Sequence, residues 1–243
     1  DKNHPFLSGK VVSEACHSSN APGQGVSSVC PGGVTESTTS NSGLNCDGAI
    51  TGCNHGTHVA GIAAGRLSSS NFYGVARDAS VIAIQVFSRI DNPAICGNDP
   101  VPCARSAVSD QMKGLERVQS LNSSFNIASA NMSLGGGYFP SNCDSEPHKP
   151  EIDNLRSLGI ATVIASGNDG HIDGISSPAC ISSAISVGST EDGSGGIVTD
   201  SVSNFSNSAF FLNLLAPGRL IQSSVPGGYD FLQGTSMAAP HVA

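Results

Sequence analysis

Apolar residues along this chain alternate between short continuous runs and helical spacing. Runs of strand length lie at 81–87, 125–134, 160–166 and 184–189. Apolar residues at helical intervals are Val108, Met112, Leu115 and Val118, followed by Ile152 with Leu155. Strands that alternate with helices predict an α/β fold of three layers, α/β/α, around a mostly parallel central sheet. In such sheets, ligands bind at the carboxyl ends of the strands.

The 243 residues fit one α/β domain, so we expect residues 1–243 to form a single domain. A stretch at about 13–51 is rich in Ser, Gly, Pro and Asn and holds four cysteines. It is predicted to be a long loop tied by disulfides. A second loop is predicted at 193–208.

Charge and hydropathy narrow the choice of partners. The formal net charge is -8, and Lys and Arg form no cluster, whereas a nucleic-acid surface needs a basic face. No apolar run approaches the ~18 residues of a membrane-spanning helix. We therefore expect no nucleic-acid partner and no membrane partner, and a monomer.

The eight cysteines form an even set without the repeated C-x-x-C spacing of zinc modules, so disulfides are predicted. Only Cys96 with Cys103 is assigned, because CGNDPVPC is a short Gly/Pro loop that one bridge can close. The other pairings stay open. Disulfides indicate an oxidising compartment, so we expect a secreted, extracellular protein.

Two segments carry candidate chemistry. In GTSMAAPHVA (234–243), Ser236 lies among small residues that leave its hydroxyl accessible, as a nucleophile requires. In NHGTHVAGIAAG (54–65), His55 lies at the start of a predicted helix. His55 and His58 lack the Glu and the four-residue spacing of the usual zinc helix, so a metal pair is not favoured. Taken singly, each segment also fits a helix start packed through small residues.

The order of the two segments limits the class of serine enzyme. In α/β-hydrolases the acid and the histidine follow the serine, but only residues 237–243 follow Ser236. The order His, Asp, Ser belongs to paired β-barrels, which the alternation of strands and helices contradicts. The order Asp, His, Ser on an α/β sheet remains.

Both segments resemble the histidine and serine signatures of the subtilisin-like serine peptidases. Four further segments resemble the family in the same order: NMSLGGG (131–137), VIASGNDG (163–170), SSPAC (176–180) and FSNSAFFLNLLAPG (205–218). The resemblance implies a serine endopeptidase with Ser236 as nucleophile and His55 as general base. It also implies Asn168 as side-chain donor to the oxyanion, and a structural role for His58.

The resemblance further implies that a polypeptide substrate lies as an added strand beside Ser133, Leu134 and Gly135. The segments expected to wall the main pocket contribute Ala165, Ser166, Gly167 and Ser176. They supply no carboxylate, although Asp169 could reach the rim. We therefore expect a broad preference for apolar or aromatic residues.

The chain departs from the family at the catalytic aspartate. DKNHP (1–5) matches only the second half of the family's aspartate segment, so Asp1 is not the catalytic acid. We expect that aspartate upstream of this chain, both ends to fall inside the domain, and the isolated fragment to be poorly folded and inactive. We expect no cofactor. A structural calcium stays open, because the loop at 66–74 has the length of a family calcium loop, but that loop contains no carboxylate to support it.

Two other functions remain open. One is a catalytically inactive subtilisin-like domain that binds peptides. The other is a structural, disulfide-linked secreted domain in which each motif serves packing. The presence of Ser236, His55 and Asn168 in the order of the family favours the peptidase over both.

Overall fold

The computed structural model describes residues 1–193 and 198–243, which form two compact units. The first unit comprises Asp1–Arg117 and Ser224–Tyr229, and the second comprises Val118–Ser223 and Asp230–Ala243. That 1–243 form a single domain stays a prediction.

The first unit contains small sheets and the helix that begins at His55. Its strands are β1 (Val11–His17), β2 (Val26–Ser28), β3 (Glu36–Ser37), β4 (Arg66–Leu67), β5 (Phe72–Tyr73), β6 (Val81–Gln85), β7 (Ser88–Ile90) and β8 (Cys103–Arg105). β1 lies between β3 and β6 and runs parallel to β6, with Ala15 opposite Ile84. β7 pairs antiparallel with β2 and β8, and β4 with β5. The predicted strand at 81–87 is therefore present as β6.

The helices of this unit are α1 (His55–Ala64), α2 (Pro93–Cys96) and the start of α3 (Val108–Leu121), with 3-10 turns at Pro22–Gln24, Pro31–Gly33 and Ser68–Ser70. α3 occupies the stretch in which apolar residues repeat at helical intervals. Of the four spaced apolar residues, Leu115 and Val118 are buried, Met112 is half-buried, and Val108 at the helix start is exposed.

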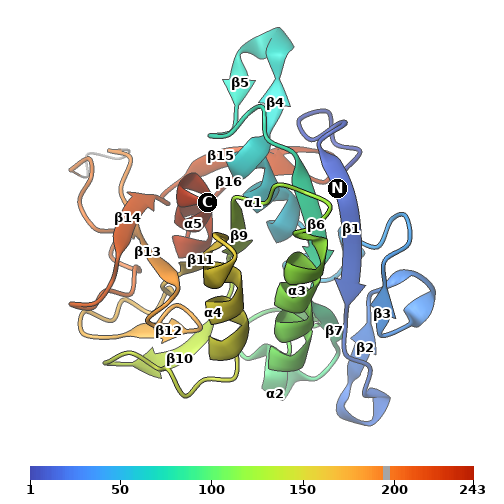
Figure 1. The fold of residues 1–243 in the computed structure, drawn as a ribbon, viewed down its shortest axis with the longest axis horizontal. Helices are drawn as coiled ribbons and strands as arrows, with labels where there is room; N and C mark the ends of the chain where they lie inside the picture. The colour runs from blue at the N-terminus through green and yellow to red at the C-terminus, as the bar shows by residue number, and fades with distance from the viewer. Residues whose placement is uncertain (194–197) are drawn as a thin grey trace. The chain divides into compact units, whose positions relative to one another are not determined.

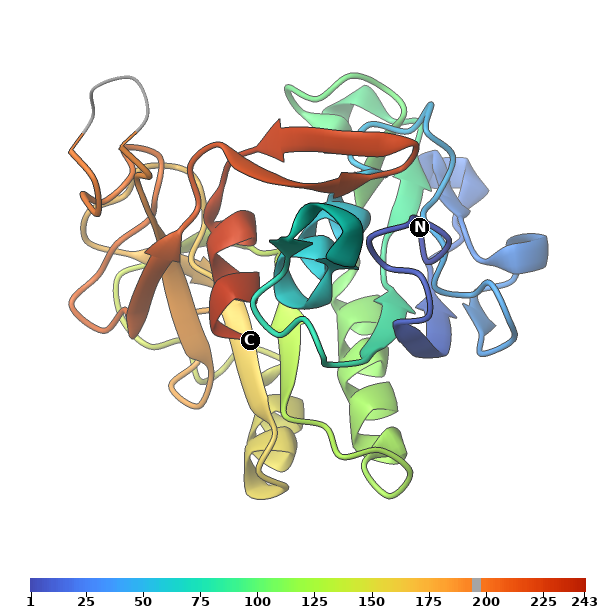
Figure 2. The same ribbon diagram turned by 90° about the horizontal axis from the view of Figure 1, so that it is seen from above.

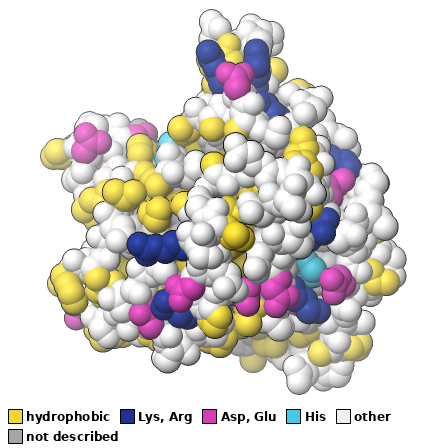
Figure 3. All heavy atoms as spheres, viewed as in Figure 1, with side chains coloured by type: hydrophobic (Ala, Val, Ile, Leu, Met, Phe, Trp, Pro, Cys, Tyr) yellow, Lys and Arg dark blue, Asp and Glu magenta, His cyan; other side chains and the backbone are white. Residues whose placement is uncertain are grey.

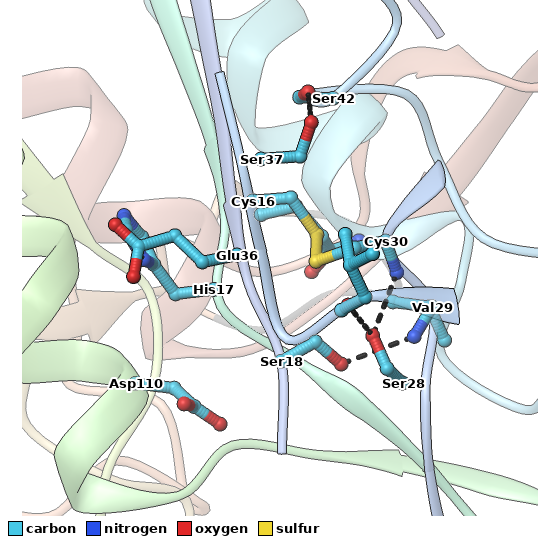
Figure 4. The surroundings of a disulfide bond; sticks show 12 residues. Cys16, His17, Ser18, Ser28, Val29, Cys30, Glu36, Ser37, Ser42 and Asp110 are labelled. Carbon is cyan, nitrogen blue, oxygen red and sulfur yellow. Dashed lines mark hydrogen bonds and ion pairs between the residues drawn. A yellow bond between two sulfur atoms is a disulfide. The ribbon is translucent and has the colours of Figure 1, made fainter. Parts of the chain in front are cut away.

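The stretch predicted as a loop at 13–51 contains more structure than expected. β1 continues through it to His17, and β2 and β3 follow. The disulfide Cys16–Cys30 joins the end of β1 to the segment after β2 (Figure 4). Beside it, the N–H of Val29 donates to Ser18 Oγ at 3.1 Å. The strand was missed because VVSEACH mixes polar residues into a segment that is only partly buried.

In the second unit, four parallel strands lie in the order β14-β13-β11-β9 (Figure 1). They are β9 (Ser129–Met132), β11 (Ala161–Ala165), β13 (Ile185–Thr190) and β14 (Leu214–Pro217), and β10 (Gly136–Phe139) pairs antiparallel with β12 (Ile175–Ser177). The helices are α4 (Lys149–Ser157) and α5 (Thr235–Val242). β15 (Ile221–Val225) pairs with β16 (Gly228–Leu232), and the residues of this hairpin are divided between the two units. Of the loop predicted at 193–208, residues 194–197 lie outside the described residues.

Helices cover the parallel sheet of the second unit. α5 packs against all four strands, and α4 packs against β11. In Figure 2, α5 is the red helix that ends at the C-terminus. Val163 and Ala165 of β11 form a buried cluster with Ala238 and Ala239 of α5. Successive strand residues face opposite sides, so the fully buried Ile164 faces away from α5. Both faces of β11 are thus covered, and the predicted α/β fold with a mostly parallel sheet is confirmed.

The described residues hold four disulfides: Cys16–Cys30, Cys46–Cys53, Cys96–Cys103 and Cys143–Cys180. The predicted bridge between Cys96 and Cys103 is confirmed. In the second unit, Cys143–Cys180 is reinforced by the N–H of Cys143, which donates to the carbonyl of Cys180 at 3.0 Å. This bridge therefore fixes the segment before α4 to the segment after β12.

Removing Cys143–Cys180 through Cys143→Ala with Cys180→Ala is expected to lower the free energy of unfolding. The bridge spans 37 residues, so its loss should cost about 2–4 kcal/mol, because the unfolded chain regains that loop's freedom. Cys96–Cys103 spans only 7 residues, so its removal should cost less. Urea unfolding of both variants measures the difference, and an equal loss in the two would contradict the loop argument.

On the face shown in Figure 3, Lys and Arg side chains are spread among Asp and Glu and do not merge into one basic surface. Of the helices in 1–193 and 198–243, none has the length and apolar character needed to cross a bilayer.

Candidate active site

His55 is the first residue of α1 in the first unit. Its N–H donates to the carbonyl of Gly52 at 3.1 Å, which sets the turn into the helix. The buried face of α1 consists of Thr57, His58, Gly61, Ile62 and Ala64. His55, the histidine predicted to be catalytic, keeps some solvent exposure as a residue, whereas His58 has none.

Burial lowers the pKa of His55 to about 4, and the charge of His58 acts in the same direction. A carboxylate at the ring would oppose this shift by stabilising the imidazolium. The imidazole of His55 is therefore uncharged at neutral pH. A neutral ring can accept a proton, which is the first requirement of a general base.

Acid should destabilise the folded chain partly through His55. Folding depresses the pKa of His55 from about 6.5 to about 4. The contribution of His55 to the free energy of unfolding is therefore fully present above pH 6.5 and is lost as the pH falls toward 4. The unfolded state binds the proton more readily in this window, and the loss between pH 7 and pH 4 should be on the order of 3 kcal/mol. Urea unfolding at pH 7 and pH 4 measures it. His55→Gln should show a smaller difference, and identical pH dependence in the two proteins would contradict the shift.

Ser236 is the second residue of α5 in the second unit. Gly234 precedes the helix with φ of 146°, a conformation that favours glycine. Met237 is buried, Ala238 and Ala239 are buried against the sheet, and Ser236 is only partly buried. The packing of the residues after it therefore holds the hydroxyl at the amino end of a helix, where the backbone N–H groups favour negative charge.

Asn168 lies in the loop that follows β11, and its side chain contacts the start of α5. Its Oδ1 accepts from the N–H of Thr235 at 2.8 Å and from Thr235 Oγ1 at 3.0 Å. Thr235 Oγ1 in turn accepts from the N–H of Gly167 at 3.1 Å. Since these bonds occupy Oδ1, the Nδ2 group is the part of the amide left to donate. Asn168 is exposed, so that donor is accessible.

Ser133 also lies beside Ser236. Ser133 Oγ donates to the carbonyl of Ser236 at 2.7 Å, and Ser236 Oγ donates to the carbonyl of Ser133 at 3.4 Å. Asn131 Nδ2 donates to Ser133 Oγ at 2.9 Å. Of the predicted substrate segment, Ser133 and Leu134 are partly buried and Gly135 is exposed. The second unit thus brings Ser133, Asn168 and Ser236 together at the start of α5.

The other predicted pocket residues lie behind this surface. Ala165, Ser166 and Ser176 are buried, and Ser166 Oγ donates to the carbonyl of Asn207 at 2.8 Å. Ala165 packs against α5, and the hydroxyls of Ser166 and Ser176 bind Asn207, so these side chains do not form an open surface. Their place in a substrate pocket stays a prediction.

Sequence reasoning missed three residues of this region. Thr235 orients Asn168, and Asn207 binds the loop around it. Glu146 Oε2 accepts from Ser177 Oγ at 2.8 Å, so a carboxylate lies next to a segment expected to have none. Thr235 could have been found from its place beside Ser236. Asn207 lies in the family-like segment 205–218, but nothing in that segment indicates its contact with the loop around Asn168. Glu146 lies outside the recognised segments and gave no signal.

The described parts of the chain contain no group of three or more His, Cys, Asp or Glu placed to hold a metal ion. The loop at 66–74 forms the β4–β5 hairpin, and Arg66 pairs with Asp78 at 2.7 Å at its base.

Comparison with known proteins identifies the family. The model of the subtilase family of peptidases matches residues 1–243. The chain is 34% identical to alkaline serine exoprotease A of Vibrio alginolyticus over 200 residues, 81% of this chain and 31% of that protein. It is 36% identical to subtilisin BL of Lederbergia lenta over 193 residues, 79% of this chain and 61% of that protein. It thus spans less than two thirds of the length of either relative.

Solved structures agree with this assignment. A cold-adapted subtilisin-like serine proteinase is 33% identical, with a TM-score of 0.56 over 77% of this chain and 57% of that one. The S41 psychrophilic protease is 25% identical, with a TM-score of 0.71 over 99% of this chain and 70% of that one. With a family match over its whole length, the chain belongs to the subtilase family of serine peptidases.

Proposed function

We propose that this chain carries the catalytic centre of a secreted serine endopeptidase, with Ser236 as nucleophile, His55 as general base and Asn168 as oxyanion donor. The observation that carries the proposal is the pair of hydrogen bonds from Thr235 to Asn168 Oδ1, at 2.8 and 3.0 Å. They hold a side-chain amide at the helix start that contains Ser236 and leave its N–H groups free for a developing oxyanion.

The reaction follows from these groups. Ser236 Oγ attacks the scissile carbonyl carbon while His55 takes the hydroxyl proton, and the carbonyl oxygen becomes an oxyanion near Asn168 Nδ2 and the N–H of Ser236. His55 then gives the proton to the leaving amine as the C–N bond breaks, leaving an acyl ester on Ser236. Water, deprotonated by His55, cleaves the ester and restores both residues. An aspartate upstream of Asp1 to orient His55 stays a prediction.

Polypeptides are the substrates of the peptidase family, and we propose that the peptide lies beside Ser133, Leu134 and Gly135 as an added strand. The exposed backbone at Gly135 supports this placement. A broad apolar or aromatic preference remains part of the proposal. The carboxylates of Glu146 and Asp169 already accept from Ser177 and Asn207, which reduces their capacity to bind a basic side chain.

The four disulfides support an oxidising, extracellular location, because reducing compartments keep such thiols unpaired. A monomeric state stays a prediction.

Covalent labelling tests the function. A fluorophosphonate should react with Ser236 in the full-length protein, because only an activated serine displaces its leaving group. Mass spectrometry after digestion should place the adduct on the peptide containing residues 234–243. A peptide-binding or structural domain predicts no adduct, and that result would favour the inactive alternative.

A further inference from the structure

Asn207 is a fully buried amide in the second unit, and the reaction described above makes no use of it. Asn207 lies between β13 and β14 in the sequence and contacts the loop after β11 that contains Asn168. We propose that Asn207 is a positioning residue for the oxyanion donor Asn168, an inference that rests on the proposed function of Asn168.

Asn207 binds the peptide groups on both sides of Asn168. Its backbone N–H donates to the carbonyl of Gly167 at 3.0 Å, which belongs to the peptide bond before Asn168. Its side-chain Oδ1 accepts from the N–H of Asp169 at 2.9 Å, which belongs to the peptide bond after it. Fixing both peptide planes fixes the two backbone dihedrals of Asn168, and therefore the direction of its side chain.

The amide of Asn207 uses its full hydrogen-bonding capacity. Oδ1 also accepts from the N–H of His171 at 3.1 Å, and Nδ2 donates to Asp169 Oδ2 and Ser176 Oγ, both at 3.3 Å. Two acceptor and two donor positions are all that an asparagine side chain has. Aspartate would lack the donors, and leucine would remove the acceptor that the N–H groups of Asp169 and His171 share.

Gly167 lets the loop lie directly on this amide. Its φ is 109°, and a Cβ there would lie 2.2 Å from Asn207 Nδ2 and 2.4 Å from Ser176 Oγ. A side chain at Gly167 would therefore displace Asn207. The close contact shows that the loop and the buried amide are fitted to each other.

Two independent sets of bonds thus determine where Asn168 Nδ2 lies. Asn207 fixes the backbone of Asn168, and Thr235 fixes its Oδ1. A donor held in this way needs no reorganisation when the oxyanion forms. Without Asn207, the loop can move, and a displacement of about 1 Å at a reacting group can cost ~10²-fold in rate.

The first test compares two asparagines in the full-length protein. Asn207→Ala is expected to lower kcat about 10–100-fold per active site, counted by fluorophosphonate titration, with KM changed less than about twofold. Asn213→Ala is the matched control, because Asn213 Oδ1 also accepts from a backbone N–H, that of Ser186 at 2.9 Å. Its kcat should stay at the wild-type value. Equal losses in the two variants, or no loss in Asn207→Ala, would overturn the proposal.

A double-mutant cycle separates positioning from general damage. If Asn207 acts through Asn168, Asn207→Ala should have little further effect on kcat once Asn168→Ala is present. A loss as large in that background as in the wild type would show that Asn207 acts elsewhere.

A measurement without turnover keeps this inference apart from the proposed function. Hydrogen exchange at the amides of Asp169 and His171 should be at least tenfold faster in Asn207→Ala, with exchange at Ser186 unchanged. A wild-type protein without hydrolysis would refute the function, and exchange would still decide whether Asn207 holds the loop. Unchanged exchange at both amides would overturn the proposal. Asn207→Ser, which keeps a short acceptor, enters the same assays if the alanine variant does not fold.

Discussion

Replacing Ser236 with alanine is expected to reduce kcat for peptide hydrolysis about 10⁶-fold, the scale known for removal of a subtilisin nucleophile. The loss should be this large because attack by water then proceeds without an acyl ester on the enzyme. Alanine fits the site, since Ser236 Oγ makes one long contact, 3.4 Å to the carbonyl of Ser133. The variant should therefore fold as the wild type does.

Peptide hydrolysis by the full-length protein, followed with a chromogenic peptide, measures this change. Ser157→Ala is the control, because Ser157 lies at the end of α4 and its Oγ donates to a backbone carbonyl at 2.7 Å. It should keep full activity. Hydrolysis by Ser236→Ala within tenfold of the wild-type rate would remove Ser236 from the role of nucleophile.

The parts of the fold that could be predicted are those whose signal is local. β6, β11 and β13 are short apolar runs, and α3 and α4 show helical spacing of buried residues. The disulfide Cys96–Cys103 could be assigned because its short loop contains Gly and Pro, whereas Cys46–Cys53, with the same separation of 7 residues, was left open. Each of these signals depends on neighbouring residues alone, so the sequence contains it in full.

The parts that could not be predicted depend on distant partners. β10 and β12 contain glycine and serine and exist because they pair with each other, with Gly136 opposite Ser177. Cys143 and Cys180 are 37 residues apart, and nothing near either cysteine marks the other. Strand pairing and long-range disulfides depend on how the whole unit packs, and a local sequence pattern carries no information about that packing.

The candidate site divides in the same way. Ser236, His55 and Asn168 could be proposed because each lies in a segment with a recognisable pattern. The orientation of Asn168 depends on Thr235 and Asn207, which are 67 and 39 residues away along the chain. The buried hydroxyls of Ser166 and Ser176 also bind Asn207. Residue types were thus accessible from the sequence, whereas the bonds that fix their geometry were not.

Asn168→Ala is expected to lower kcat about 10²–10³-fold, the usual cost of losing one oxyanion donor. KM should stay nearly constant, because the charge that Nδ2 meets exists only in the transition state. The backbone should keep its shape, since Asn207 still binds the peptide groups of Gly167 and Asp169.

Steady-state kinetics of Asn168→Ala in the full-length protein give kcat and KM separately, with active sites counted by fluorophosphonate labelling of Ser236. The matched control is Asn154→Ala, an exposed amide on α4 that contacts Glu151 at 3.5 Å and should leave both constants unchanged. Labelling of Ser236 should persist in Asn168→Ala, although more slowly, because the nucleophile and its base remain. A rise in KM with kcat intact would mean that Asn168 binds the substrate in its ground state, and the oxyanion would then have to be held by the backbone N–H of Ser236 alone.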